Sequence, residues 1–121
     1  MKVLIVDDFA TMRRIVRNVL KQIGFINMVE ADNGKAALKV LKKETIDLIL
    51  CDWNMPEMPG IDLLKAIKSD DELKHIPFVM VTAEAQKENI VEAVKAGVNN
   101  YIVKPFSAET VSEKLKIIFK D

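Results

Sequence analysis

Short apolar runs alternate with longer amphipathic stretches along the chain. Five runs that end in polar or turn residues predict β-strands, at residues 3–6, 27–31, 47–51, 78–81 and 101–103. The stretches between them carry apolar side chains at helical spacing, for which the segment from Met12 to Ile23 is typical. Because residues 48–51 are apolar at every position, this strand should be buried on both faces, as in a parallel sheet covered by helices.

Five strands that alternate with five helices predict an α/β fold with a doubly wound parallel sheet. Short connections force parallel strands with right-handed crossovers. Gly24 and Gly97 should follow the last turns of the first and fourth helices, and Ser107 should be the N-cap of the fifth. The second helix should run from the turn at residues 32–34 to about residue 43. The fourth helix is predicted to direct three residues inward: Ile90, Val94 and Val98.

Composition adds limits on the class of protein. The 121 residues suit one domain, and with half of them hydrophobic and 30% charged they are typical of a soluble globular protein. The formal net charge is zero, so nothing indicates a nucleic-acid partner. No apolar run approaches a membrane span, and the N-terminus does not read as a signal peptide. Cys51 is the only cysteine, and a buried single thiol suits a cytoplasmic protein.

Polar residues follow four of the predicted strands at the point where each strand ends. They are Asp7, Asp8, Asp52, Thr82 and Lys104. Parallel strands place their carboxyl ends at one edge of the sheet, which is where open α/β folds bind ligands. One aspartate at a strand end would be an ordinary turn residue. An acid pair, a third acid, a hydroxyl and a lysine at successive ends predict a functional site.

The residue types at this edge indicate phosphoryl chemistry with a divalent cation. Three carboxylates in one crevice repel one another and need a cation. A site made of oxygen ligands suits Mg²⁺ better than zinc or copper, and His75 is a lone histidine. Lys104 and Thr82 leave room for a dianionic phosphoryl group, and a carboxylate such as Asp52 can be its acceptor.

Six stretches of the sequence together resemble the response-regulator receiver domain, and most closely its stand-alone chemotaxis members. They are residues 6–9, 11–17, 52–56, 81–85, 87–90 and 104–106. The resemblance covers essentially the whole chain, so residues 1–121 are expected to be one receiver domain with no effector domain. It implies a flavodoxin-like three-layer sandwich with strand order 2-1-3-4-5. Pro59 departs from the family, which usually has aspartate before Gly60, and should stiffen that loop.

The resemblance also implies roles for the residues at the predicted edge. Asp52 would accept a phosphoryl group from a phosphohistidine of a chemotaxis-type sensor histidine kinase. Lys104 would pair with the phosphoryl oxygens, Thr82 would sense them, and the Lys104–Pro105 bond would be cis. The ligands of Mg²⁺ would be the carboxylates and one backbone carbonyl: Asp7, Asp8, Asp52 and Asn54. Asn54 and Glu84 would flank the path of the attacking water and tune the lifetime of the acyl phosphate.

The implied output is binding to another protein rather than catalysis on a substrate. The chain would act as a monomer that catalyses only its own phosphorylation and dephosphorylation, and a dedicated phosphatase is a further candidate partner. A flagellar motor switch protein would dock on a face formed by the fourth helix, the fifth strand and the fifth helix. Its residues would be Ala85, Lys87, Ile90, Tyr101 and Lys114. The Tyr101 ring should point outward or be mixed without phosphorylation and turn inward with it.

Other functions fit the sequence less well. A haloacid-dehalogenase-type phosphatase would share the aspartate nucleophile, but its Asp-x-Asp pair usually follows the first strand, and no cap domain is present here. Neither Gly24 nor Gly34 belongs to a nucleotide-binding loop, and Asp7 and Asp8 would repel a flavin phosphate. Within the family, a phosphorelay intermediate or phosphate sink without motor binding remains open, because its catalytic edge would be identical.

Overall fold

Five parallel strands form a single sheet in the computed structural model, which describes residues 1–119. The strand order is β2-β1-β3-β4-β5, as the sequence predicts. The strands are β1 (Lys2–Val6), β2 (Asn27–Ala31), β3 (Leu48–Cys51), β4 (Phe78–Thr82) and β5 (Asn100–Val103). β1 lies between β2 and β3, with Val3 in register with both Met28 and Leu48. The predicted strands therefore all exist, with ends that differ by one residue at most.

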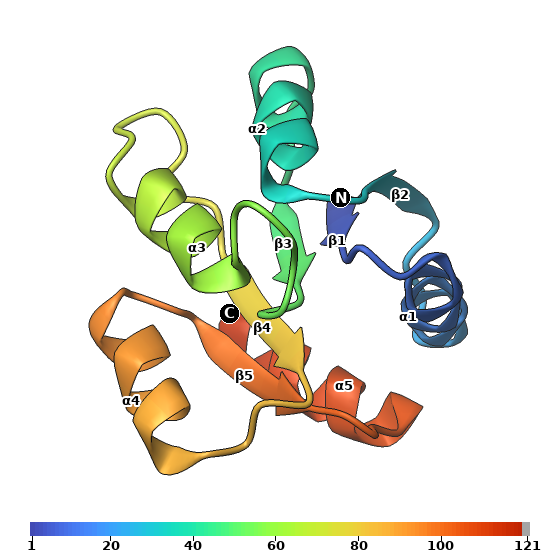
Figure 1. The fold of residues 1–121 in the computed structure, drawn as a ribbon. Coiled ribbons are helices and arrows are strands. Elements are labelled where there is room, and N and C mark those ends of the chain that lie inside the picture. The colour runs from blue at the N-terminus through green and yellow to red at the C-terminus, as the bar shows by residue number, and fades with distance from the viewer. Residues whose placement is uncertain (120–121) are drawn as a thin grey trace.

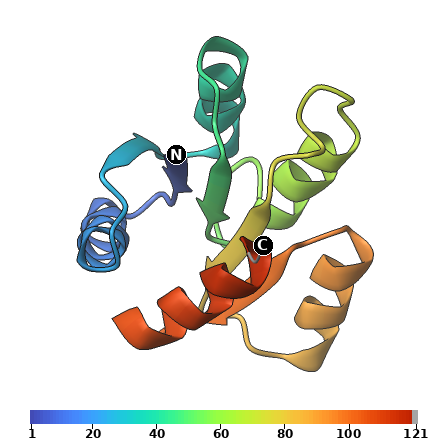
Figure 2. The same cartoon turned by 180° about the vertical axis from the view of Figure 1, so that it is seen from behind.

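Helices cover both faces of the sheet and make the three layers of the fold. They are α1 (Ala10–Gln22), α2 (Gly34–Lys43), α3 (Gly60–Lys68), α4 (Lys87–Lys95) and α5 (Ala108–Ile118). α1 and α5 lie on one face, whereas α2, α3 and α4 lie on the other (Figures 1 and 2). This is the predicted doubly wound, flavodoxin-like sandwich. None of the helices within residues 1–119 has the length and apolar character needed to cross a membrane.

The hydrophobic core is divided by the sheet into two clusters. Along β1, Leu4 and Val6 contribute to the cluster under α2, α3 and α4. Val3 and Ile5 contribute to the cluster under α1 and α5. Successive side chains of a strand point to opposite faces, so a strand that is covered twice must be apolar at every position. This explains the uninterrupted apolar runs of the sequence.

Side-chain caps and glycines set the helix ends at the predicted places. The side chain of Asn33 accepts a hydrogen bond from the Ala36 N–H at 2.8 Å and begins α2. Ser107 accepts one from the Thr110 N–H at 3.1 Å and begins α5. Gly24 has a φ of +104°, a left-handed conformation that favours glycine directly after a helix. The chain can therefore turn sharply from α1 towards β2.

One predicted inward residue is wrong. Val94 is 62% exposed, and the buried residue of α4 is its neighbour Ala93. Ile90 and Val98 pack against the core as expected, although both are only partly buried. Ala93 lies one helical turn after Ile90, so a short alanine occupies the position closest to the sheet and position 94 is rotated outward. Ile15, which shares the apolar spacing of α1, is also exposed, at 43%.

Candidate functional site

The carboxyl edge of the sheet brings Asp7 and Asp52 together. Val6 is in register with Cys51. Asp7 directly follows β1 at Val6, and Asp52 directly follows β3 at Cys51. The pairing continues for one further hydrogen bond, from the Asp52 N–H to the Val6 carbonyl at 2.9 Å. The parallel register itself therefore places the two carboxylates side by side, with Asp8 following in the loop.

Three carboxylates converge at this edge as the sequence predicts. One oxygen from each of Asp7, Asp8 and Asp52 lies within 4.8 Å of the others. Asp7 is 3% and Asp52 8% exposed, whereas Asp8 is exposed to solvent. Such a set of hard oxygen ligands, with one side open to water, fits Mg²⁺, which keeps several waters when it binds proteins. The cluster is therefore suited to a divalent cation of this kind.

Lys104 supplies a positive charge directly against the acids. It follows β5, and its N–H donates to the Thr82 carbonyl at 2.9 Å, so the ladder between β4 and β5 extends to it. Its Nζ lies 3.1 Å from Asp7 Oδ2 and 3.7 Å from Asp52 Oδ1. The Lys104–Pro105 bond is cis, as predicted. Thr82 is fully buried between these groups.

Asp52 experiences opposing influences on its protonation. Burial raises the pKa of its carboxyl group and Asp7 raises it further, while Lys104, the Thr82 hydroxyl and the Trp53 N–H lower it. The Trp53 N–H donates to Asp52 Oδ1 at 2.7 Å. A carboxylate must be ionised to act as a nucleophile, so Lys104 favours the reactive form that burial disfavours.

Gly60 is a site-forming residue that the sequence interpretation missed. The loop after β3 turns back so closely that a Cβ at Gly60 would overlap the Asp52 carbonyl oxygen. The Gly60 N–H also donates to the Trp53 carbonyl at 2.8 Å. A glycine before an apolar helix indicates that another part of the backbone approaches it closely, but the sequence does not say which residue that is. The loop closes over the acceptor because this position carries no side chain.

Glu84 joins three parts of the site. Its carboxylate accepts from the Asn54 Nδ2 at 2.8 Å and from the Asn89 Nδ2 at 3.1 Å. Its carbonyl accepts from the Tyr101 hydroxyl at 2.6 Å. The resemblance implies that Asn54 and Glu84 flank the path of the attacking water, and in the structure their side chains are in contact. Asn89 in α4 was missed, because an asparagine on a helix carries no signal of its partner in the sequence.

The Tyr101 ring points inward in this structure. Its side chain is 9% exposed and belongs to the core cluster under α2, α3 and α4. The sequence interpretation expects an outward or mixed ring without phosphorylation, and this stays a prediction, because one rotamer does not report a population. Its hydroxyl finds the Glu84 carbonyl, which satisfies the polar end of an otherwise buried ring. Burial, together with Glu84 and Asp52, raises the pKa of Tyr101 to about 12.

The other residues of the predicted partner face lie at different depths. Ala85 lies before α4 and Lys87 is its first residue, and both are exposed. Ile90 packs against the core and is partly exposed. Lys114 in α5 is half-buried, and its carbonyl accepts from the Asn100 Nδ2 of β5 at 3.1 Å. α5 is thereby attached to β5 within the predicted face.

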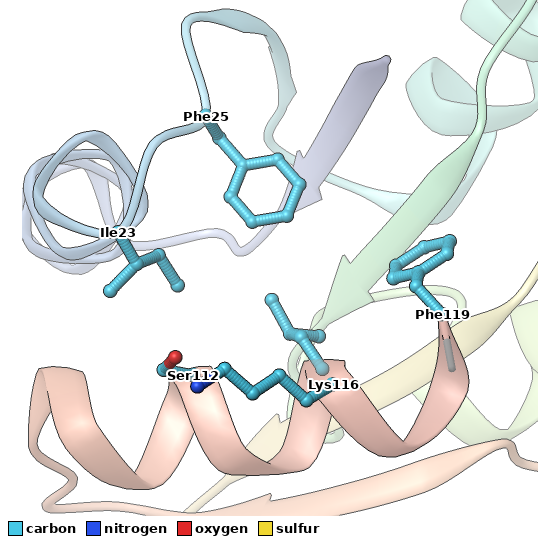
Figure 3. A pocket seen from close by; sticks show the side chains of 6 residues that line it. Ile23, Phe25, Ser112, Lys116 and Phe119 are labelled. Carbon is cyan, nitrogen blue, oxygen red and sulfur yellow. The ribbon is translucent and has the colours of Figure 1, made fainter. Parts of the chain in front are cut away.

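A separate hollow lies at the opposite edge of the sheet, between the end of α1 and α5 (Figure 3). Its volume is about 450 Å³. Its lining is largely apolar: Ile23, Phe25, Ser112, Leu115, Lys116 and Phe119. It contains none of the carboxylates of the acid cluster and is therefore separate from the candidate site at the carboxyl edge.

Known proteins are similar to this chain in sequence and in fold. Residues 3–116 match the response regulator receiver domain family. The chain is 62% identical over 120 residues to the chemotaxis protein CheY-3 of Vibrio cholerae, covering 99% of this chain and 92% of that protein. The solved chemotaxis protein CheY4 of Vibrio cholerae has a TM-score of 0.88 at 34% identity, covering 97% of both chains. The Mn²⁺-bound form of the response regulator Rcp1 has a TM-score of 0.83 at 25% identity, covering 98% of this chain and 94% of that one.

These similarities extend over nearly the full length of the relatives as well as of this chain. The matched region includes the three acids, Thr82 and Lys104, and the observed strand order is that of the solved relatives. Receiver domains are signalling proteins, and the relatives named here at high identity act in chemotaxis. The chain therefore belongs to the response-regulator receiver domain family, in its CheY-type chemotaxis branch.

Proposed function

We propose that Asp52 accepts a phosphoryl group from a phosphohistidine of a chemotaxis-type sensor histidine kinase. The observation that carries this proposal is the meeting of three carboxylates within 4.8 Å, with the Lys104 ammonium against two of them. Membership of the receiver family supports the same role. The protein would be a signalling component rather than an enzyme, with catalysis limited to its own phosphorylation and dephosphorylation.

Mg²⁺ is the cofactor that we propose for this edge. Its ligands would be the carboxylates of Asp7, Asp8 and Asp52 and the backbone carbonyl of Asn54. The Mn²⁺-bound form of the similar regulator Rcp1 supports a divalent ion in this fold. When bound, Mg²⁺ supplies the positive charge that neutralises the phosphoryl oxygens during transfer.

The residues of the chain perform the transfer mainly by positioning. A carboxylate oxygen of Asp52 attacks phosphorus, and the new P–O bond forms as the N–P bond to the donor imidazole breaks. The electron pair of that bond stays on the imidazole nitrogen, which takes a proton. The Lys104 ammonium and the Thr82 hydroxyl then bind the phosphoryl oxygens, because both lie beside Asp52.

The contact between Asn54 and Glu84 supports a role in the lifetime of the acyl phosphate. Hydrolysis requires water to approach phosphorus from the side opposite Asp52. The Asn54 amide lies two residues after the acceptor and is held by the Glu84 carboxylate at 2.8 Å. Polar side chains in that position can orient or obstruct the water, so substitutions there should change the rate of hydrolysis more than the rate of phosphorylation.

The proposed output is the binding of a flagellar motor switch protein to the face formed by α4, β5 and α5. High identity to a chemotaxis protein supports this over a phosphorelay intermediate or phosphate sink. Phosphorylation would draw the Thr82 hydroxyl towards the phosphoryl group, and the Tyr101 ring beside it is already inward. The signal would then be a stabilisation of the inward ring and of the surface around Ala85, Ile90 and Lys114.

Further features follow from the same proposal. The protein would act as a monomer in the cytoplasm, where its single buried thiol, Cys51, stays reduced. A dedicated phosphatase could use the exposed Asn54 side of the site.

Phosphorylation by a small donor tests the central chemistry. Acetyl phosphate with Mg²⁺ should add one phosphoryl group that is labile in base, and peptide mapping should locate it on Asp52. Lys104→Ala should impair phosphorylation or its transmission, because the phosphoryl dianion loses a fixed counter-charge. A phosphoryl group mapped to another residue of the wild-type protein would contradict the proposal.

Peptide binding separates motor signalling from a relay or sink. A helical peptide from a motor switch protein is titrated against the chain with and without beryllofluoride, which stands in for the phosphoryl group on Asp52. Tighter binding with beryllofluoride supports motor signalling. Equal affinities would reject it and favour the relay or sink, while leaving the phosphoacceptor chemistry intact.

A further inference from the structure

The backbone between the two acids of the β1–α1 loop is held by a side chain from α1. The Arg13 Nη1 donates to the Asp7 carbonyl oxygen at 2.7 Å. β1 ends at Val6, so this carbonyl lies beyond the paired strand, although the Asp7 N–H still donates to Ala31 at 3.1 Å. The carbonyl belongs to the peptide unit that links Asp7 to Asp8, and Arg13 therefore fixes the orientation of that unit.

The other edge of the same guanidinium is attached to β2. The Arg13 Nε donates to Glu30 Oε1 at 2.9 Å, and the Arg17 Nη1 donates to Glu30 Oε2 at 2.8 Å. Glu30 lies in β2, in register with Ile5 of β1, so the carboxylate that binds Arg13 comes from the strand next to β1. The planar guanidinium presents its donors in fixed directions, so its contacts with the Glu30 carboxylate and the Asp7 carbonyl are made in fixed relative geometry. Arg13 is 18% exposed in its side chain, about half the value for Arg17.

The two acids differ in what else holds them. The Asp7 carboxylate accepts from the Phe9 N–H at 2.9 Å and from the Lys104 Nζ at 3.1 Å. Asp8 is exposed, and the direction of its side chain depends on the peptide unit before it. A tilt of that unit would move the Asp8 carboxylate away from those of Asp7 and Asp52.

We propose that Arg13 is a positioning residue for divalent-cation binding, which aims the Asp8 carboxylate by holding the Asp7–Asp8 peptide unit. The inference rests on the proposed function, because it concerns the same metal site. The charge of Arg13 alone would repel a cation at the neighbouring acids. If Arg13 strengthens cation binding, it must therefore do so through geometry. Loss of Arg13 should then weaken cation binding, whereas a purely electrostatic role predicts that its loss strengthens binding.

Arg13→Lys and Arg17→Lys form a matched pair for the first test. Both keep the charge and both weaken a contact with Glu30, but only Arg13 touches the Asp7 carbonyl. Mg²⁺ is titrated while the fluorescence of Trp53, the only tryptophan, is recorded. Arg13→Lys should weaken Mg²⁺ binding about tenfold, as substitutions behind metal ligands do. Arg17→Lys should bind Mg²⁺ as the wild type does.

Arg13→Gln tests the sign. Removing a positive charge near the acids would tighten Mg²⁺ binding if charge alone mattered, whereas loss of positioning should weaken it. Urea unfolding without Mg²⁺ measures the stability that each variant loses and confirms that both are folded; Arg13→Gln should lose more than Arg17→Gln, because it also loses the contact with the Asp7 carbonyl. Unchanged or tighter Mg²⁺ binding in Arg13→Gln would overturn the proposal, as would equal weakening in Arg17→Gln. Failure of the wild type to bind Mg²⁺ would instead reject the proposed function.

Discussion

Lys68 and Asp52 lie at opposite edges of the sheet, Lys68 among neutral oxygen acceptors and Asp52 among charged groups. At the amino edge, the Lys68 Nζ donates to the carbonyls of Lys74 and Ile76, both at 3.3 Å, and to the Asn99 Oδ1 at 3.1 Å. At the carboxyl edge, Asp52 lies among two further carboxylates and one ammonium. Burial lowers the pKa of Lys68 and raises that of Asp52, so for both side chains burial disfavours the charged form.

The difference between the two edges is the kind of partner. Lys68 has neutral oxygen acceptors that join the end of α3 to the segments before β4 and β5, so its hydrogen bonds hold these segments together although burial disfavours its charge. Burial and, to a smaller degree, Asp7 disfavour the charge of Asp52, and Lys104 offsets only part of this combined effect. A site that must bind a cation and a phosphoryl group carries unfavourable electrostatics in its free form. The amino edge is therefore expected to serve stability, and the carboxyl edge to serve function.

The largest effect that sharpens this comparison is expected for Asp52→Asn. The substitution keeps the shape of the side chain but removes the acceptor oxygen, so phosphorylation by acetyl phosphate should be lost completely. The free energy of unfolding without Mg²⁺ should stay the same or rise by about 1 kcal/mol, because a buried charge and its repulsion with Asp7 are removed and these together exceed the lost attraction to Lys104. Urea unfolding and mass spectrometry measure the two quantities. A clear loss of stability would show that the acid is held favourably in the free protein.

Lys68→Met should have the reverse effects. It keeps most of the apolar stem but leaves the carbonyls of Lys74 and Ile76 without this donor, while the Asn99 Oδ1 keeps the Phe78 N–H. The free energy of unfolding should fall by about 1–2 kcal/mol, as for loss of a partly exposed charged hydrogen-bond donor. Phosphorylation should be unchanged. A variant with normal stability would break the comparison, and so would one that loses phosphorylation while it remains folded.

A smaller effect is expected from a strained residue in the loop after β3. Glu57 has a φ of +66°, which favours glycine, and its side chain makes only an exposed contact with Lys35 at 3.7 Å. Glu57→Gly should raise the free energy of unfolding by about 0.5–1 kcal/mol. Glu57→Ala is the control, because it removes the same contact and keeps the strain. Equal stabilities of the two variants would argue against strain at this position of the carboxyl edge.

The smallest effect concerns Tyr101, the only tyrosine. Its pKa is raised from the ordinary value of 10.0 to about 12, because burial and the nearby Glu84 and Asp52 disfavour the phenolate. The fold therefore gains stability from the neutral phenol below pH 10, and this gain is lost as the pH rises through 12. Ultraviolet titration should give a midpoint near 12. Tyr101→Phe should lose stability less steeply over that range, and a midpoint near the ordinary value would contradict a buried ring.

The acid cluster and the sheet could be predicted because both depend on strong local signals. Apolar runs end where Asp7, Asp52, Thr82 and Lys104 begin, and parallel topology brings all strand ends to one edge. Caps such as Ser107 act within three residues. These features need no knowledge of how a helix is rotated or where a polar side chain reaches.

The errors and omissions lie where tertiary geometry decides. A helical repeat does not distinguish Ala93 from Val94 as the inward residue, because a small rotation exchanges them. The inward ring of Tyr101 depends on a backbone carbonyl, which has no sequence signature. Arg13 and Lys68 look like solvated helix residues in the sequence, yet both donate to backbone carbonyls outside their own helices.

The most direct test of the account measures how much Mg²⁺ stabilises the protein. If the acids form a cation site, Mg²⁺ at about a hundred times its dissociation constant should raise the wild-type free energy of unfolding by about 2.7 kcal/mol. Asp8→Ala should lose most of this gain, because Asp8 is an exposed member of the cluster. Asp62→Ala, which removes an exposed acid of α3, should keep it. An equal gain in wild type and Asp8→Ala, or no gain in either, would contradict the assignment of the carboxyl edge.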